Sequence, residues 1–265
     1  TVQPTKSMPS LTIELPQTKQ ELDRFTAEQW QAAIAADPCD GAQWMLNGAA
    51  LGSANAQTIL GQWLLDGHGI ERSAQQAFTW FLKAAVQGHP MGMNMTGRCF
   101  ENGWGTAVDH FVAANWYRQA AHKGLDAGMY NYANLLAAGK GVAQNHGHAL
   151  EWYRRAADLN HAKSMTKIGH YYEDGLVVEQ DLDAAFFAFG EAARGGDFRG
   201  QFNYASMLAQ RGHLEDALAW LRKVPETATP AYLLQAGQKL VLSARPAFQA
   251  IGQQMLDSLQ RAQLA

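Results

Sequence analysis

Cysteine is almost absent from this sequence, in which Cys39 and Cys99 are the only two among 265 residues. They form no CxxC pair and no Cys/His finger spacing, so the sequence suggests neither a zinc site nor a disulfide framework. Cysteine use of this kind fits a reducing compartment, and we expect a cytoplasmic protein. The sequence starts at Thr1 instead of Met, and a leader removed before Thr1 would make the location periplasmic.

Charged residues and long apolar runs are also scarce. Charged side chains make up 17% of the sequence, and the formal net charge is −3. The low charge content argues against a disordered chain or a coiled coil, and the slight negative charge gives no reason to expect a nucleic acid partner. No stretch approaches the ~20 apolar residues that a membrane span needs. Apolar residues still reach 47% and prolines number only 8, which is typical of a helix-rich chain with a core.

The sequence does contain a repeat, with a step of 36 residues. Glycine-rich turns recur at this step as Gly67-His68-Gly69, Gly103-Trp104-Gly105, Gly139-Lys140-Gly141 and Gly175-Leu176-Val177. Aromatic pairs recur in the same register as Trp80-Phe81, Trp116-Tyr117 and Trp152-Tyr153, followed by Ala188-Phe189. A series of small residues runs Gly61, Gly97, Ala133, Gly169 and Ala205. Because these series keep one register over four units, they indicate a repeat array.

Each unit has the pattern of two helices. In the third unit, residues 128–138 carry apolar residues at helical spacing, and Gly139 is expected to end this helix. Residues 147–159 give the second helix, whose apolar face holds Ala149, Trp152, Tyr153, Ala156 and Ala157. The aromatic stripe is therefore predicted to be core and not a ligand cage, and helices are predicted to break at Gly67, Gly103, Gly139 and Gly175.

Three groups of residues in the first clear unit carry a family resemblance, namely Leu60-Gly61, Gly67-x-Gly69-Ile70 and Ala77-x-x-Trp80-Phe81-x-Lys83-Ala84-Ala85. Over roughly residues 40–225 this pattern resembles the Sel1-like repeat, a bacterial-type relative of the tetratricopeptide repeat. The resemblance implies an all-α fold, a right-handed superhelical solenoid of antiparallel helix pairs with about five repeats and helical caps. It also implies adaptor or scaffold roles. The regularly spaced cysteines of the family's disulfide-linked branch are missing, which puts that branch's secreted location and penicillin binding in doubt.

Four segments follow from these patterns. We predict an extended arm at residues 1–17, a helical cap with a degenerate repeat at 18–52, the Sel1-like array at 53–225 and a second helical cap at 226–265. The front cap rests on a capping box with a hydrophobic staple, Phe25-Thr26-x-x-Gln29-Trp30, and Thr229-Pro230 starts a helix at the back. The arm contains Leu11, Ile13 and Leu15 in strand-like alternation, and it is expected to pack on something apolar.

Three features resemble chemical sites, and none has the residues that its chemistry requires. His146 and His148 lie close enough to share a metal, but no carboxylate or cysteine is placed beside them. The Gly-x-Gly turns do not follow strands and lack the Lys-Ser/Thr of a phosphate loop. His170 and Glu173 lie within one helical turn and could form an acid/base pair, but nothing supplies a nucleophile or an oxyanion donor. We therefore predict no catalytic residue, no metal, no cofactor and no enzyme activity.

The surface of interest is the groove that the first helix of each unit lines in tetratricopeptide-type solenoids. Positions −6, −3, −2, +1 and +4 from the small mid-helix residue are taken as groove-facing. They hold mostly polar residues, with Tyr130 and Phe202 as flat anchors, which is the composition of a peptide-binding groove. The predicted partner-binding residues are Asn94, Arg98, Tyr130, Asn131, Asn134, Lys163, Lys167, His170, Arg199 and Phe202. A concave face that is merely soluble is the alternative.

The function expected from this groove is that of a non-enzymatic adaptor or scaffold that binds a partner protein or peptide. Asn94 and Arg98, then Asn131, then Lys163 and Lys167 are predicted to trap a C-terminal or side-chain carboxylate of the partner. Ion pairs within one repeat, such as Arg98 with Glu101, are the alternative to this clamp. Two alternatives to the adaptor remain open. One is an inhibitor or immunity protein that blocks a cognate toxin, and the other is a hydrolase-type enzyme.

Overall fold

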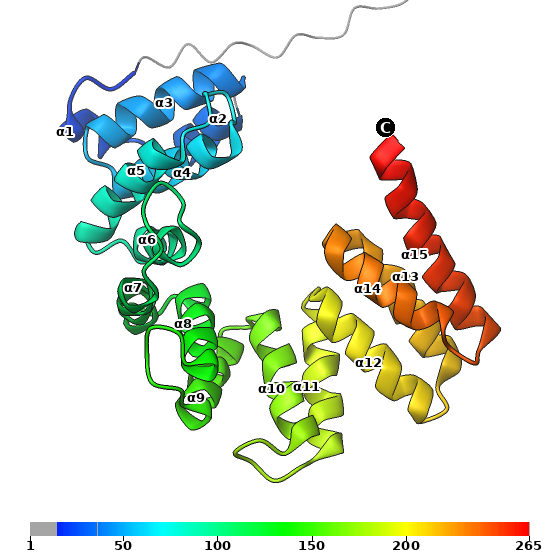
Figure 1. The fold of residues 1–265 in the computed structure, drawn as a ribbon. Helices are drawn as coiled ribbons and strands as arrows, with labels where there is room; N and C mark the ends of the chain where they lie inside the picture. The colour runs from blue at the N-terminus through cyan, green and yellow to red at the C-terminus, as the bar shows by residue number, and fades with distance from the viewer. Residues whose placement is uncertain (1–14, 36, 265) are drawn as a thin grey trace, which may run out of the picture. The chain divides into compact units, whose positions relative to one another are not determined.

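The computed structural model describes residues 15–35 and 37–264, and all regular structure within these ranges is helical (Figure 1). The prediction of an all-α protein built from antiparallel helix pairs is confirmed. Four of the five residues that suggested a short strand, from Leu11 to Glu14, lie outside the described residues, as does nearly all of the predicted arm.

The described residues form fifteen helices. They are α1 (Lys19–Leu22), α2 (Ala27–Ala35), α3 (Pro38–Ala50), α4 (Ala54–Asp66), α5 (Ala74–Val86), α6 (Pro90–Asn102), α7 (His110–His122), α8 (Asp126–Ala138), α9 (His146–Asp158), α10 (Ala162–Asp174), α11 (Leu182–Arg194), α12 (Phe198–Gln210), α13 (Leu214–Thr227), α14 (Pro230–Val241) and α15 (Pro246–Leu264).

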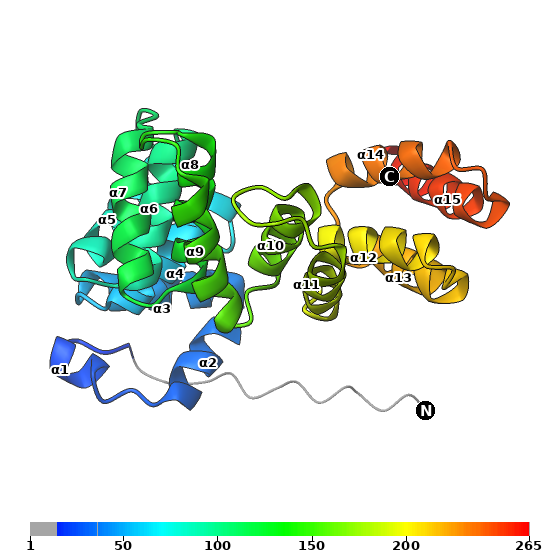
Figure 2. The ribbon, with the colours of Figure 1, turned by 90° about the horizontal axis from the view of Figure 1, so that it is seen from below.

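The chain divides into two compact units. The N-terminal unit runs to Gly128 and includes Lys140–Val142, whereas the C-terminal unit contains Met129–Gly139 and continues from Ala143. Within the N-terminal unit α4 packs on α5 and α6 on α7, and within the C-terminal unit α10 packs on α11, α12 on α13 and α14 on α15 (Figures 1 and 2). We call α4, α6, α8, α10, α12 and α14 the first helices and their partners α5, α7, α9, α11, α13 and α15 the second helices.

The two helices of a pair approach closely because a small residue on the first meets an aromatic ring on the second. A Cβ atom at Gly97 would lie 2.7 Å from the Tyr117 ring, and one at Gly169 would lie 2.5 Å from the Phe189 ring. Phe81, Tyr117, Tyr153 and Phe189, which share this place in four repeats, are at most 1% exposed. The prediction that these residues are core is confirmed.

A tryptophan precedes three of these four rings, and Trp80, Trp116 and Trp152 are only partly buried. Trp116 packs against Ala85 and Met93 of the neighbouring repeat. The expectation that both aromatic residues fill the core therefore holds only for the second. One residue of helix turns a side chain by about 100°, so Trp116 points toward the seam between repeats while Tyr117 points into its own pair.

The predicted helix boundaries are confirmed at both kinds of end. First helices end just before Gly67, Gly103, Gly139 and Gly175, each of which has a positive φ. At the front, the Thr26 and Gln29 side chains each accept a hydrogen bond from the other's backbone N–H, at distances of 3.3 and 2.8 Å, as a capping box requires. Thr229 caps α14 and Pro246 begins α15.

The fourth repeat departs from the glycine-rich turn. Val177 stands where the earlier repeats have their second glycine, and its φ is +57°. A β-branched residue is strained in this left-handed region by about 1–3 kcal/mol, whereas glycine adopts it freely at an entropic cost of about 0.5–1 kcal/mol. We expect Val177→Gly to raise the free energy of unfolding by about 1 kcal/mol, measured by urea denaturation. Leu176→Gly, next to it but without a positive φ, should lower the stability.

Candidate functional site

One kind of contact joins successive first helices once in each unit, α4 to α6 and α10 to α12. In two repeats, the residue before the first helix caps that helix, and its side chain also reaches the first helix of the preceding repeat. His89 Nδ1 accepts a hydrogen bond from the Gly92 N–H at 3.1 Å and lies 3.2 Å from the Thr58 hydroxyl on α4. Asp197 accepts hydrogen bonds from the Gly200 N–H at 3.1 Å and the Thr166 hydroxyl at 2.6 Å. These contacts fix the neighbouring faces of successive first helices relative to one another within each unit.

The cap at His89 predicts that the N-terminal unit loses stability in acid. Burial lowers the pKa of His89 below its usual value of 6.5, because removal from water disfavours the charged ring. The ring accepts the Gly92 N–H on Nδ1, and its Nε2 lies 2.8 Å from Asn55 Oδ1. Between the lowered folded pKa and 6.5 the unfolded chain binds the proton and the folded chain does not. Stability is therefore expected to fall as the pH drops through this window.

The measurement is the melting temperature at pH 7.5 and at pH 5.5, compared with that of His89→Ser. Serine caps α4 at Ser53 and does not titrate in this range, so the variant should lose less stability on acidification than the wild-type chain. Equal losses in both proteins would mean that other groups carry the pH dependence.

The predicted groove residues of the N-terminal unit are partly used by the fold. Asn94 is buried, at 4% exposure. The Arg98 guanidinium lies 4.9 Å from the centre of the Trp104 ring, and Glu101 accepts a hydrogen bond from the Tyr117 hydroxyl at 2.6 Å. Glu101, considered as an ion-pair partner of Arg98, thus has a different contact. A cavity of about 400 Å³ beside Arg98 is lined by Gln62, Leu64, Leu65, Asp66, Arg72, Ala74, Arg98 and Trp104.

In the C-terminal unit, the predicted residues of α8 also serve packing. Asn134 Oδ1 accepts a hydrogen bond from the Tyr153 hydroxyl at 2.7 Å. The Tyr130 ring lies 5.9 Å from that of Tyr153 and 4.9 Å from the His161 ring. Burial raises the pKa of Tyr130, so its hydroxyl stays neutral. Asn131 is half-buried on the same helix.

The two predicted lysines of α10 differ in their surroundings. Lys163 is exposed, whereas Lys167 is half-buried. Burial lowers the pKa of Lys167, the positive charge of Arg199 on α12 lowers it further, and Asp197 acts in the opposite direction. Lys167 and Arg199 therefore lie close enough for their charges to repel.

A cavity of about 210 Å³ lies where α10, α12 and α14 meet, and we call it the α14 pocket. Its lining combines cations, amides and aromatic rings: His170, Arg199, Phe202, Asn203, Tyr232, Gln235, Ala236 and Lys239. Three predicted partner-binding residues, His170, Arg199 and Phe202, are thus brought together. Phe202, predicted as a flat anchor, is only 4% exposed because it packs in the core under Tyr232, with 6.2 Å between the ring centres.

His170 stands at the edge of this pocket in a short hydrogen-bonded chain. Its Nδ1 lies 3.2 Å from Glu173 Oε2, and its Nε2 lies 3.1 Å from Asn203 Nδ2. The neutral ring satisfies both contacts when it donates to Glu173 and accepts from Asn203. The ring also stacks edge-on against Phe189 at 5.0 Å. His170 and Glu173 do meet, as their spacing suggests, and the contact holds the imidazole in place.

The sequence patterns did not point to Tyr232, Gln235 and Lys239 as site residues. They belong to α14, in the segment predicted as a helical cap, because the step from Asp197 to the next capping residue, Thr229, shortens to 32 residues. The series of small residues that ends at Ala205 could have indicated these three residues. Extended by the same 32 residues, it reaches Gly237, where a Cβ atom would lie 2.9 Å from Leu256 of α15.

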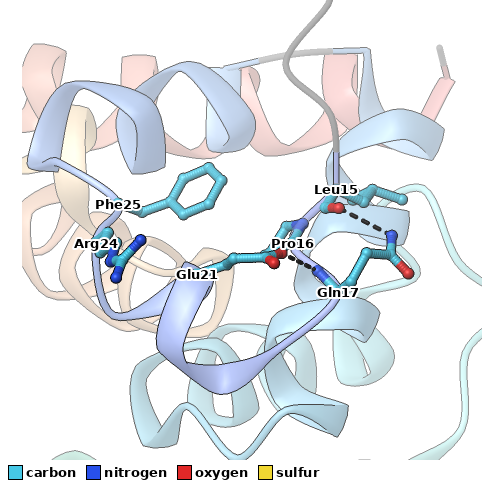
Figure 3. Close-up of a pocket in the computed structure, with 6 residues that line it drawn as sticks. All are labelled: Leu15, Pro16, Gln17, Glu21, Arg24 and Phe25. Atoms are coloured by element: carbon cyan, nitrogen blue, oxygen red, sulfur yellow. Dashed lines mark hydrogen bonds between the residues drawn. The ribbon is translucent and has the colours of Figure 1, made fainter.

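The largest of the cavities described lies at the front of the chain and has about 690 Å³ (Figure 3). It is lined by Leu15, Pro16, Gln17, Glu21, Arg24 and Phe25. Its polar groups bond to one another, since the Gln17 N–H donates to Glu21 Oε2 at 2.7 Å and Gln17 Nε2 donates to the Leu15 carbonyl at 3.0 Å. Arg24 is the cation of this cavity, and its guanidinium forms no ion pair with a described residue.

The described part of the chain contains no cluster of three His, Cys, Asp or Glu side chains able to hold a metal ion. His146, considered as a metal ligand, lies 3.0 Å from the Tyr171 hydroxyl through its Nδ1. Among the described residues, no helix is both long and apolar enough to cross a bilayer.

The predicted carboxylate clamp spans both units. Arg98 belongs to the N-terminal unit, and Asn131, Lys163 and Lys167 belong to the C-terminal unit. Convergence of these side chains on one carboxylate stays a prediction.

Paired helices that repeat with one register, one small residue and one buried ring per pair define a helical repeat protein. The sequence matches the family model described as the Sel1 repeat at residues 54–89, 90–125, 126–161 and 162–197. The chain belongs to the Sel1 repeat family, whose members generally mediate protein–protein interactions and are generally not enzymes. Among curated proteins, none is detectably similar to it in sequence.

Solved structures share the fold at low sequence identity. A Sel1 repeat protein from Oxalobacter formigenes is 23% identical with a TM-score of 0.76, over 89% of this chain and 100% of that one. The protective antigen c5321 of uropathogenic Escherichia coli is 20% identical with a TM-score of 0.66, over 92% of this chain and 54% of that one. The immunity protein Pa5087 from Pseudomonas aeruginosa is 15% identical with a TM-score of 0.55, over 78% and 81% respectively.

Proposed function

We propose that this protein is a non-enzymatic adaptor that binds a partner protein or peptide on the exposed faces of its first helices. The α14 pocket is the observation that carries the proposal. Three first helices contribute cations, amides and aromatic rings to one small cavity. Of these residue types, aromatic residues and arginine are enriched in protein recognition sites. Family membership supports the same conclusion, because Sel1 repeats generally mediate protein–protein interactions.

A photo-crosslinking experiment tests the adaptor function. Benzoylphenylalanine is introduced at Lys163, which is exposed on the first helix α10, and in a second protein at Phe187, which is 66% exposed on the second helix α11. Each protein is irradiated in a lysate of the organism that encodes it. We expect one partner protein to be captured at position 163 and not at 187. Capture at 187 alone, or at neither position, would overturn the proposal.

An inhibitor is the second candidate, and it is favoured by the shared fold of the immunity protein Pa5087. In this case the partner captured at position 163 would be a toxin or enzyme, and the purified chain would block its activity at a one-to-one ratio. An adaptor leaves the activity of its partner intact. The activity of the captured partner, assayed with and without the chain, therefore separates the two functions.

A further inference from the structure

Two cations that line the α14 pocket form no ion pair within the described residues. Arg199 and Lys239 are both exposed, and neither lies within 4.0 Å of a carboxylate oxygen of a described residue. The nearby Asp197 is 5% exposed and is bonded to Thr166 and to the α12 N-terminus. Glu173 pairs with His170. Neither carboxylate forms an ion pair with Arg199 or Lys239, so the N–H donors of these two cations are able to bind an external anion.

Aromatic rings hold both cations in position. The Arg199 guanidinium lies 4.6 Å from the centre of the Phe198 ring and 5.4 Å from that of Tyr232, and Lys239 Nζ lies 5.3 Å from the Phe202 ring. Cation–π contacts keep the side chains over apolar walls while leaving their N–H donors available. Burial raises the pKa of the Tyr232 hydroxyl to about 12, so this group remains a neutral donor beside them.

The size of the pocket limits what it can take. Its volume of about 210 Å³ is below the ~300–1,000 Å³ of sites for drug-sized ligands, so it accommodates a group about as large as one amino-acid residue. Its lining offers hydrogen-bond donors for an anion and aromatic surface for an apolar group. The C-terminal residue of a polypeptide carries a carboxylate and a side chain on one Cα atom, which matches this combination. An aspartate or glutamate side chain would leave the Tyr232 ring uncovered.

We propose that the α14 pocket binds the C-terminal residue of the partner polypeptide. Arg199 and Lys239 bind the free carboxylate, Asn203 and Gln235 bind the last peptide group, and the Tyr232 ring contacts an apolar side chain. This assignment rests on the proposed adaptor function and specifies which part of the partner is recognised. It adds α14 to the recognition surface and does not require the residues predicted for the carboxylate clamp.

Peptide binding to the full chain tests the assignment. An array of hexapeptides with a free C-terminus, varied at the last residue, is compared with the same peptides in amidated form. The best pair is then measured by fluorescence anisotropy. We expect peptides that end in an apolar residue to bind and amidation to weaken binding at least tenfold. The double variant Arg199→Gln, Lys239→Gln should weaken binding of the free peptide by a similar factor and leave binding of the amidated peptide unchanged.

A matched control removes the same charge elsewhere. Lys140→Gln with Arg222→Gln replaces two exposed cations outside the pocket and should leave peptide binding unchanged. Equal binding of free and amidated peptides, preference for amidated peptides with internal Asp or Glu, or no peptide binding would overturn the assignment. Photo-crosslinking at position 163 is scored separately. If the Arg199→Gln, Lys239→Gln protein fails the peptide test but still captures a partner at position 163, the adaptor function is supported. Only the assignment of the α14 pocket is then wrong.

Discussion

Tyr117→Ala is expected to lower the free energy of unfolding by about 3–5 kcal/mol, the usual cost of truncating a large aromatic residue in a core. The Tyr117 side chain is fully buried at 0% exposure and lies against Gly97 of its partner helix. Truncation leaves a cavity between α6 and α7 that glycine cannot fill. It also removes the hydroxyl that donates to Glu101 at 2.6 Å. Urea denaturation followed by circular dichroism measures the loss.

Two variants separate the contributions to this loss. Tyr117→Phe keeps the ring, which fits because Phe81 and Phe189 occupy the same place in other repeats. It should cost about 1.5–3 kcal/mol, the value of one hydrogen bond to a charged group. Trp116→Ala should cost less than Tyr117→Ala, since Trp116 is only partly buried at the seam with the neighbouring repeat. A larger loss for Trp116→Ala would mean that the contact between repeats, and not the core of each pair, carries the stability.

The repeat architecture was predictable because its determinants are local and periodic. Gly67, Gly103 and Gly139 end helices through their own backbone conformation, and the Thr26–Gln29 capping box lies within one helical turn. A step of 36 residues then places equivalent groups on equivalent faces. Neither kind of signal requires knowledge of distant contacts, so both could be obtained from the sequence.

The recognition surface was less predictable. The position of a residue along a helix indicates which way its side chain points, but not whether a neighbouring helix buries it. Phe202 and Asn94 occupy equivalent positions in their helices and were both expected to be accessible, yet each is 4% exposed. In the case of Phe202 the cover comes from Tyr232, on a helix that follows a shortened step. The α14 pocket depends on this contact between helices whose spacing breaks the repeat, so periodicity alone did not indicate it.

The second large effect is expected at the glycine-rich turns, where Gly105→Ala should lower the free energy of unfolding by about 2–5 kcal/mol. Gly105 has a φ of +71°, which costs another L-residue about 1–2 kcal/mol. A Cβ atom would also lie 2.2 Å from the Ala74 carbonyl oxygen at the start of α5. Backbone cannot move aside as a side chain can, and overpacking of this kind adds about 1–3 kcal/mol. The turn after α6 would have to separate from α5, which weakens the contact between adjacent repeats on which an array depends.

Gly124→Ala is the matched control for the conformational part of this cost. Gly124 has a φ of +84°, but nothing lies within 4 Å of the position its Cβ atom would take. It should therefore lose only the ~1–2 kcal/mol of a left-handed alanine, and the difference between the two variants measures the clash with Ala74. Equal losses would show that the turn can shift away from α5 at little cost. In that case the second glycine is needed only for the backbone conformation of the turn and not for its close approach to the neighbouring helix. The same small shift of the turn would explain why the fourth repeat tolerates Val177.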